Sequence, residues 1–228
     1  MKKFRLLITF VALMGFTSVQ AVEKVAKYTP EVVPKKMSVK TKKSRFYYLL
    51  VPPIQKVHAS LLQQYVDTQR DINSSQNSEN IAKLKKSYKV KSNDDLLKAL
   101  KPHPMSITLA QAAMESAWGT SRFFREAYNT FGMWNNDKAA KRIAAGEQRD
   151  GNHTVWLSSY DSLEESVRAY YKTLAKGKTY KEFREVKMGT DDVYLMVAKL
   201  DKYSERGDDY TKEIASMIRY NKFTKYDE

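Results

Sequence analysis

The spacing of apolar residues predicts a mostly helical protein. After Pro52-Pro53, which predicts a break in the chain, apolar side chains recur every three or four residues, the period of one helix face: Ile54, Val57, Leu61 or Leu62, and Tyr65. Further helical patterns occupy residues 81–88, 94–100, 107–118, 162–175, 191–200 and 208–223. In the fourth of these, Ser162 and Glu165 have the spacing of a capping box.

One short segment has the character of β-structure. Asp150-Gly151 is a preferred dipeptide for a two-residue hairpin turn, and the strand-favouring residues Thr154, Val155 and Trp156 follow it. With this turn, Glu147 would lie opposite Thr154 and on the same strand face as Trp156. The pattern therefore predicts a mainly α fold with one small β-hairpin set into the helices.

The first 21 residues have the composition of a secretory signal peptide. Lys2, Lys3 and Arg5 precede an apolar run from Leu6 to Phe16, and Val19-Gln20-Ala21 forms a plausible cleavage site. The apolar run is about half of the ~20 residues that span a bilayer, which disfavours the alternative of an uncleaved anchor. We expect export to a periplasmic or extracellular location, no stable membrane span after cleavage, and a flexible basic lead over residues 22–44.

The charge suggests an anionic environment but identifies no chemistry. The chain carries a net charge of +14 and contains no cysteine, which excludes disulfides and a lipid-modified cysteine. An exported basic protein meets cell-wall carboxylates and lipid head groups rather than nucleic acid, so we expect no nucleic-acid partner. The alternative is that the lysines only keep the protein soluble.

A single carboxylate lies on the alanine-rich helix predicted over 107–118. On a helical wheel Glu115 shares a narrow polar stripe with Thr108, Gln111, Ala112 and Trp118, while Leu109, Ala110, Ala113, Met114 and Ala117 would face the core. Gly119 ends the helix, so the acid lies in the last turn, where the helix dipole and the neighbouring Trp118 would both raise its pKa. Such an acid suits protonation of a leaving-group oxygen. The alternative is an ordinary solvated glutamate.

Two motifs resemble a known family. "LAQAAMESAWGTSRF" followed by "YNTFGMW" resembles the glucosaminidase-type peptidoglycan hydrolases of glycoside hydrolase family 73, and "FYYLLVPPI", "SLEESVRAYYKTL" and "KYSERGDDYTKEIASMIRYN" resemble its bacterial Bax-like branch. The resemblance implies an α+β, lysozyme-like fold, in which a helical lobe faces a small β-hairpin lobe across a cleft. It also implies an endo-β-N-acetylglucosaminidase that cleaves the β-1,4 bond after N-acetylglucosamine in peptidoglycan strands, with Glu115 as general acid.

The resemblance also suggests the remaining site residues. A second carboxylate is expected on the hairpin, where we favour Glu147 over Asp150 and Asp137. Water activated elsewhere, or the substrate's own N-acetyl group, could replace it. The expected contacts with substrate are Trp118, Asn129, Phe131, Trp134 and Tyr203, with Trp134 as the sugar platform and Asn129 either binding the N-acetyl group or fixing its loop. The alternatives are a core role for any one of the tryptophans and a structural role for the Tyr203 hydroxyl.

We expect no metal and no cofactor, because the three histidines are scattered without a second ligand at metal-site spacing. The domain boundaries expected are a helical extension over 45–103 and a catalytic domain over 104–228, acting as a monomer. Two other functions stay open: a lytic transglycosylase of similar fold, and a non-catalytic wall-binding protein that has kept the fold.

Overall fold

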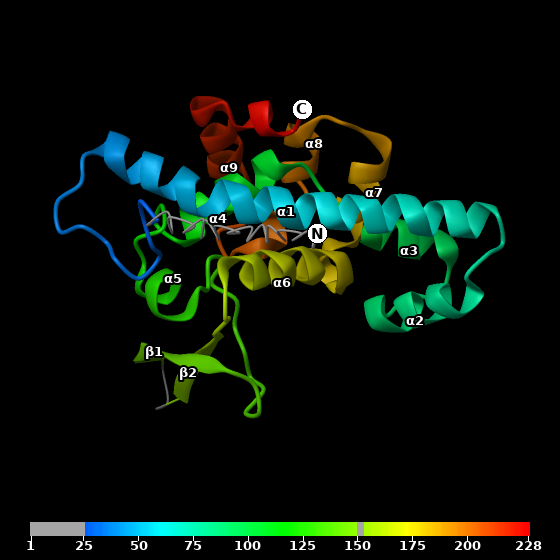
Figure 1. Ribbon diagram of the computed structural model, residues 1–228, viewed down its shortest axis with the longest axis horizontal. Coiled ribbons are helices and arrows are strands. Elements are labelled where there is room, and N and C mark those ends of the chain that lie inside the picture. The colour runs from blue at the N-terminus through cyan, green and yellow to red at the C-terminus, as the bar shows by residue number, and fades with distance from the viewer. Residues whose placement is uncertain (1–25, 150–152) are drawn as a thin grey trace, which may run out of the picture.

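In the computed structural model, which describes residues 26–149 and 153–228, helices surround one apolar core and a two-stranded sheet projects from them (Figure 1). The predicted mainly α fold with a small β-hairpin is thereby confirmed. The elements run in the order α1 (Val39–Asn73), α2 (Ser78–Tyr88), α3 (Asn93–Leu100), α4 (Met105–Glu115), α5 (Arg122–Ala127), β1 (Arg142–Arg149), β2 (His153–Ser158), α6 (Leu163–Lys176), α7 (Lys181–Gly189), α8 (Val193–Val197) and α9 (Asp208–Asn221), with short 3-10 turns at 178–180, 201–203 and 223–226.

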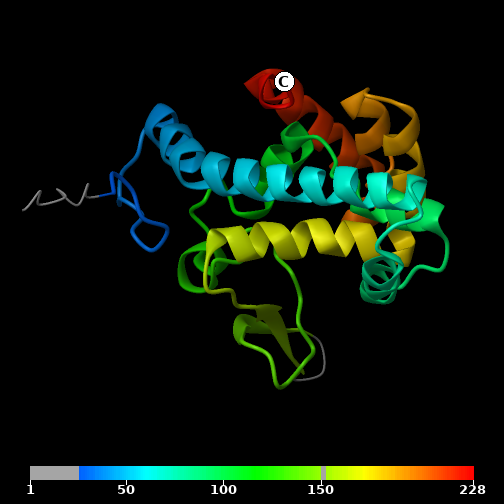
Figure 2. The same cartoon turned by 45° about the vertical axis from the view of Figure 1, so that its right-hand side comes forward.

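Helix α1 is longer than the apolar pattern predicts. It begins at Val39, inside the predicted flexible lead, where the side chain of Ser38 accepts a hydrogen bond from the backbone N–H of Thr41 at 3.1 Å. It then continues through Pro52 and Pro53, so the predicted break is wrong. Each proline removes one backbone hydrogen bond, but the buried side chains around them, including Phe46, Leu50, Ile54 and Val57, hold the helix in the core. Figure 2 shows α1 changing direction where its ribbon turns from blue to cyan.

The described part of the predicted lead packs against α1. Arg45, which is fully buried, donates from Nη2 to the carbonyl oxygens of Thr29 at 2.8 Å and Pro30 at 2.9 Å. The ring of Tyr28 contacts that of Tyr48 edge-on, at 5.5 Å between centroids. A buried guanidinium therefore connects residues 29–30 to α1, which corrects the expectation of a flexible segment at these positions.

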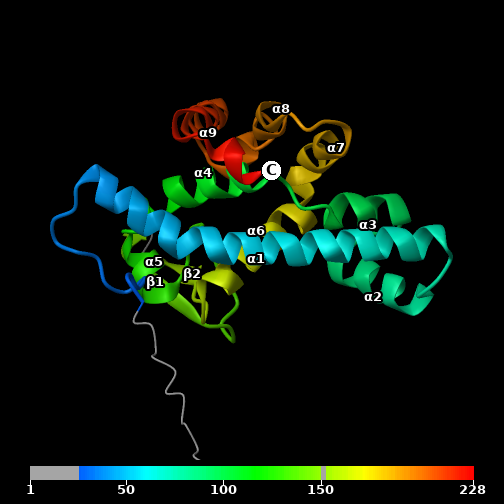
Figure 3. The same cartoon turned by 45° about the horizontal axis from the view of Figure 1, so that its top comes forward.

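Helix α4 crosses the middle of the core, between α1 and α9 (Figure 3). Its residues from Ser106 to Ala113 are all buried, so the predicted division into a polar stripe and a core face is wrong. Thr108 and Gln111 instead face other buried polar groups. Helix α6 covers the core beside α1. Ser162 is its N-cap as predicted, and its Oγ accepts from the N–H of Glu165 at 3.2 Å.

The small sheet consists of β1 and β2, paired antiparallel, but its register differs from the predicted one. Thr154 pairs with Gln148, not with Glu147, and Arg149 pairs with His153. Residues 150–152 therefore lie between the paired Arg149 and His153, three residues where a two-residue turn was predicted. The predicted turn itself lies outside the described residues. A bulge between Ala144 and Gln148, with Gly146 at φ +88°, shifts the register again.

Among the described residues, no helix is both long enough and apolar enough to cross a bilayer. The predicted signal peptide, residues 1–21, lies outside the described part of the chain.

Candidate active site

Glu115 is the last residue of α4, and an unusual turn follows it. Ala117, Trp118 and Gly119 have φ values of +51°, +61° and +73°, so the helix ends three residues earlier than the wheel assumed. Ser116 holds this turn, because its Oγ donates to the Ala112 carbonyl at 2.5 Å and accepts from the N–H of Gly119 at 2.8 Å. Left-handed backbone is costly for residues other than glycine, so this turn is a strained feature directly beside the acid.

The turn carries Trp118 away from the helix face of Glu115. Its ring packs edge-on against Phe46 at 5.1 Å and Tyr47 at 6.3 Å, and against Phe223 at 6.4 Å, all between ring centroids. Lys43 lies over the same ring, with Nζ 4.9 Å from its centroid. The structure therefore places Trp118 in an aromatic cluster with α1 and the C-terminal segment.

Glu115 has one neutral hydrogen-bond donor and is largely shielded from solvent. The Tyr210 hydroxyl, from the first turn of α9, donates to Oε1 of Glu115 at 3.0 Å. Burial raises the pKa of Glu115, while this hydrogen bond and the positive charge of Arg206 partly offset the rise. Arg206 itself is exposed and paired with Glu213 at 2.6 Å. The net effect favours the protonated carboxyl that the sequence pattern predicts.

The hydroxyl of Tyr210 belongs to a chain of buried donors that all point toward Glu115. Gln111 Nε2 donates to the Tyr210 oxygen at 2.7 Å, and Gln111 Oε1 accepts from the Tyr170 hydroxyl at 2.5 Å. The Tyr170 and Thr108 hydroxyls both donate elsewhere, so the hydrogen lies on His103 Nε2, which is 3.1 Å from the Tyr170 oxygen and 3.0 Å from the Thr108 oxygen. The chain therefore orients the Tyr210 hydrogen onto the acid.

Gly132 lies on the other side of the carboxyl. A Cβ at this position would lie 3.8 Å from Oε2 of Glu115, and the residue has φ +64°. Glycine therefore satisfies the left-handed turn and places no side chain of its own over Oε2, the oxygen that Tyr210 does not bind.

The loop that contains Gly132 is fixed by Asn129. Its buried amide donates to the carbonyls of Met133 at 2.9 Å and Ser158 at 2.8 Å, and its oxygen accepts from the N–H of Met133 at 2.9 Å. Of the two roles weighed for Asn129, these hydrogen bonds favour the fixing of its loop, and a contact with substrate stays a prediction. The loop continues along β2 through a bridge between Trp134 and Leu157, which connects the acid to the hairpin.

Phe131 and Tyr203 pack against the tyrosines whose hydroxyls belong to the hydrogen-bonded chain. Phe131 is buried, with its ring stacked on Tyr170 at 4.0 Å, and its expected contact with substrate stays a prediction. Tyr203 is partly exposed and stacks on Tyr210 at 5.6 Å with an interplanar angle of 10°. Its hydroxyl donates to the Phe131 carbonyl at 3.3 Å, which connects α9, the loop and the residues before α9.

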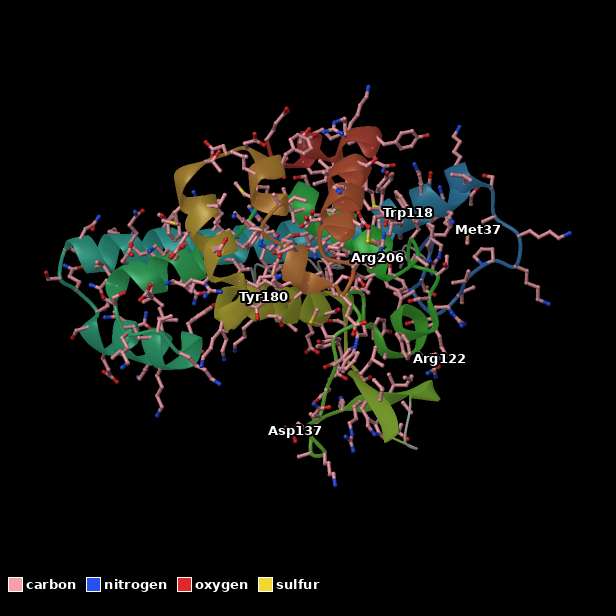
Figure 4. The ribbon with its side chains drawn as sticks, turned by 180° about the vertical axis from the view of Figure 1, so that it is seen from behind. Met37, Trp118, Arg122, Asp137, Tyr180 and Arg206 are labelled. Carbon is pink, nitrogen blue, oxygen red and sulfur yellow. The ribbon has the colours of Figure 1, made fainter. Side chains whose placement is uncertain are left out.

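The remaining candidates lie on or near the hairpin. Trp134 is 61% exposed, as a sugar platform requires. Glu147 lies in β1, beside the bulge, and its side chain lies outside the described residues, so its role stays a prediction. Asp137 is exposed and lies at the outer end of the hairpin region, well away from Trp118 and Arg206 (Figure 4). Asp150 lies outside the described residues.

Sequence reasoning missed Tyr210 as a partner of the acid. The signal was present in the helix predicted over 208–223, because Tyr210, Ile214 and Ile218 recur every four residues and therefore share one face. All three are buried. A tyrosine on an apolar face needs a buried partner for its hydroxyl, which points to a polar group in the core. The described residues contain no cluster of three or more potential metal ligands.

A shielded carboxyl with a raised pKa and one fixed neutral donor has the properties that a glycosidase general acid requires. The chain belongs to the glucosaminidase family of glycoside hydrolases, whose family model, described as mannosyl-glycoprotein endo-beta-N-acetylglucosaminidase, matches residues 90–223. The matched residues begin just before α3 and include α4, the loop that contains Gly132, the hairpin and α9.

Individual relatives are more distant. Protein bax of Escherichia coli K12 is 32% identical over 124 residues, which cover 52% of this chain and 43% of that protein. The chain thus matches less than half the length of this relative. Two similar solved structures are the catalytic domain of the Listeria monocytogenes autolysin Auto (19% identity, 85% of this chain and 100% of that one, TM-score 0.47) and the glycoside hydrolase domain of Salmonella typhimurium FlgJ (22% identity, 60% and 91%, TM-score 0.43).

Proposed function

We propose that the protein is an exported endo-β-N-acetylglucosaminidase that hydrolyses the β-1,4 bond after N-acetylglucosamine in peptidoglycan. The observation that carries the proposal is the environment of Glu115, where burial raises the pKa of the carboxyl and Tyr210 fixes one of its oxygens. Membership of the glucosaminidase family supports the reaction class. The predicted signal peptide and the net charge of +14 favour a cell-wall polymer as substrate.

In the proposed reaction Glu115 acts as general acid. Its protonated oxygen, Oε2 on the side of Gly132, gives the proton to the glycosidic oxygen as the bond to the anomeric carbon breaks. Tyr210 stabilises the carboxylate that remains, because its hydroxyl already points at Oε1. Water supplies the new hydroxyl at the anomeric carbon, and its proton returns to the enzyme. The product is a glycan fragment with a reducing-end N-acetylglucosamine.

We assign the second carboxylate to Glu147 on β1 and the sugar platform to Trp134. The bulge beside Glu147 supports the first assignment, since bulges re-aim side chains next to active sites. The exposure of Trp134 and its bridge to β2 support the second. Trp118 and Tyr203, both partly exposed, are the further contacts that we propose with substrate.

The test is digestion of peptidoglycan by the purified protein and by Glu115→Gln, with mass spectrometry of the soluble fragments. We expect hydrated fragments from the wild type and a loss of at least ~100-fold in the variant, the usual contribution of a general acid. Glu79→Gln, which changes an exposed glutamate on α2, is the matched control. Fragments lighter by one water would identify a lytic transglycosylase. No fragments with intact wall binding would identify a binding protein instead.

A further inference from the structure

Lys187 is a buried cation that the proposed reaction does not use. It lies on α7, where its side chain is 3% exposed, and its Nζ donates to the carbonyl oxygen of Lys101. In return, Nζ of Lys101 donates to the carbonyl of Lys187 at 3.0 Å. Within the described part of the chain, neither lysine forms an ion pair. A buried ammonium of this kind is costly unless a negative group compensates it.

The surroundings of Lys187 add positive charge. Burial, with Arg184 and Lys101 nearby, lowers the pKa of Lys187 to about 7. Lys187 also lines a second cavity with Asp191 and Asp227, and none of the ion pairs within the described residues joins it to either acid. An anion bound beside Lys187 would favour its charged form over the neutral form that burial favours.

A cavity of about 120 Å³ lies beside Lys187, between α1, α2, α3, α6 and α7. Four cationic side chains are among its lining residues, which include no aspartate or glutamate: Lys101, Arg168, Lys172 and Lys187. Arg168 and Lys172 are exposed at the surface of α6, whereas Lys187 and His103 are buried. The cationic groups thus extend from the solvent to the buried end of the cavity, and Arg168 among them also contacts Glu164, at 3.4 Å.

We propose that this cavity is a binding site for a small oxyanion, held by Lys187 and Lys101 and admitted past Arg168 and Lys172. Its volume is several times the ~10–15 Å³ that a water molecule needs, so a sulfate-sized ion fits. Buried Lys187 keeps two ammonium hydrogens beyond the one given to Lys101, and charge-assisted hydrogen bonds to an oxyanion would use them.

The site is distinct from the candidate active site. It lies at the end of the molecule that carries α2 and α3, away from the hairpin in both Figure 1 and Figure 3. His103 and Tyr171 line it, and His103 is also the first donor of the hydrogen-bonded chain that ends at Glu115. An ion in the cavity would therefore lie beside the far end of that chain.

The experiment is calorimetric titration of the purified protein with sulfate at constant ionic strength, with chloride as the balancing ion. We expect one saturable site per chain. Lys187→Met should weaken it by about tenfold or more, because a hydrogen bond to a charged group is lost. The control is Lys178→Gln, an exposed lysine between α6 and α7 that does not line the cavity, and it should bind as the wild type does.

Should Lys187→Met fail to fold, Arg168→Gln combined with Lys172→Gln decides the matter, since both side chains are exposed. Loss of affinity in this double variant but not in Lys178→Gln supports the site. The absence of saturable binding, or equal affinity in all variants, would overturn the proposal and leave Lys187 as a connection between α3 and α7. Because binding is measured without digestion, the result is independent of the proposed activity.

Discussion

Replacing Tyr210 with phenylalanine tests whether a single neutral donor controls the acid. The ring would keep its stacking on Tyr203, at 5.6 Å between centroids, while Glu115 Oε1 would lose the donor that now lies 3.0 Å away. That hydrogen bond favours the ionised carboxyl, so its removal should raise the pKa of Glu115 beyond the rise that burial already causes.

The size of the shift follows from the nature of the bond. A hydrogen bond to a charged group contributes about 1.5–3 kcal/mol, and each pKa unit corresponds to about 1.4 kcal/mol, so we expect a rise of about one unit, and about two at most. Gln111 Nε2 would also lose its acceptor, at 2.7 Å, which should lower the free energy of unfolding by about 1–3 kcal/mol.

The assay is the pH dependence of kcat/KM for peptidoglycan digestion. Its alkaline limb reports the pKa of the general acid in the free enzyme, so Tyr210→Phe should move that limb to higher pH by about one unit. Tyr194→Phe, on α8, is the control, since its hydroxyl does not bond to the acid. An unmoved limb in a folded Tyr210→Phe protein would refute the argument that this hydroxyl sets the pKa.

Three further predictions concern the same site and its support. Gly132→Val should lower kcat, because the branched side chain would cover Oε2 of Glu115, and it should also lower Tm, because valine at a left-handed φ costs about 1–2 kcal/mol. If Gly132→Ala lowers kcat by as much as Gly132→Val does, backbone strain alone explains the loss. Trp134→Ala should raise KM about three- to tenfold with little change in Tm, measured beside Leu195→Ala, another exposed apolar residue. Burial holds the pKa of His103 well below 6.5, so the native state resists protonation. The free energy of unfolding should therefore keep its full value above pH 6.5 and fall below that pH by up to about 1.4 kcal/mol per pH unit. Thermal melts of His103→Gln should lack this contribution to the pH dependence.

Local sequence patterns predict most of the helices but not how they are buried. Periodicity correctly places α2, α3, α6 and α9, since these helices have an exposed face that makes the apolar stripe visible. In α4 both faces are buried, so the polar stripe that indicates solvent in an amphipathic helix here indicates an internal hydrogen-bond network. The prolines of α1 are a second failure of local rules, because tertiary packing of neighbouring apolar residues outweighs the two lost hydrogen bonds.

Sequence patterns single out Glu115 as a candidate acid but do not predict the residues around it. Glu115 stands out because it is the one carboxylate in an alanine-rich segment. Tyr210 is 95 residues away along the chain, and only the packing of α9 against α4 brings the two together. The hairpin register depended on one assumed turn, and a one-residue difference there changes the partner of every residue in the strand.

The chemistry of the donors explains why Glu115 can hold a proton. A guanidinium fixed against the carboxyl would favour the ionised form strongly and lower its pKa, but Arg206 is exposed and committed to Glu213. The groups that reach the acid from the core are instead a phenol and, behind it, an amide, another phenol and a neutral imidazole. Neutral donors orient one oxygen without adding a counter-charge, so burial stays the largest influence on the pKa. The same chain would stabilise the carboxylate once its proton has left, which is what a general acid requires in both of its states.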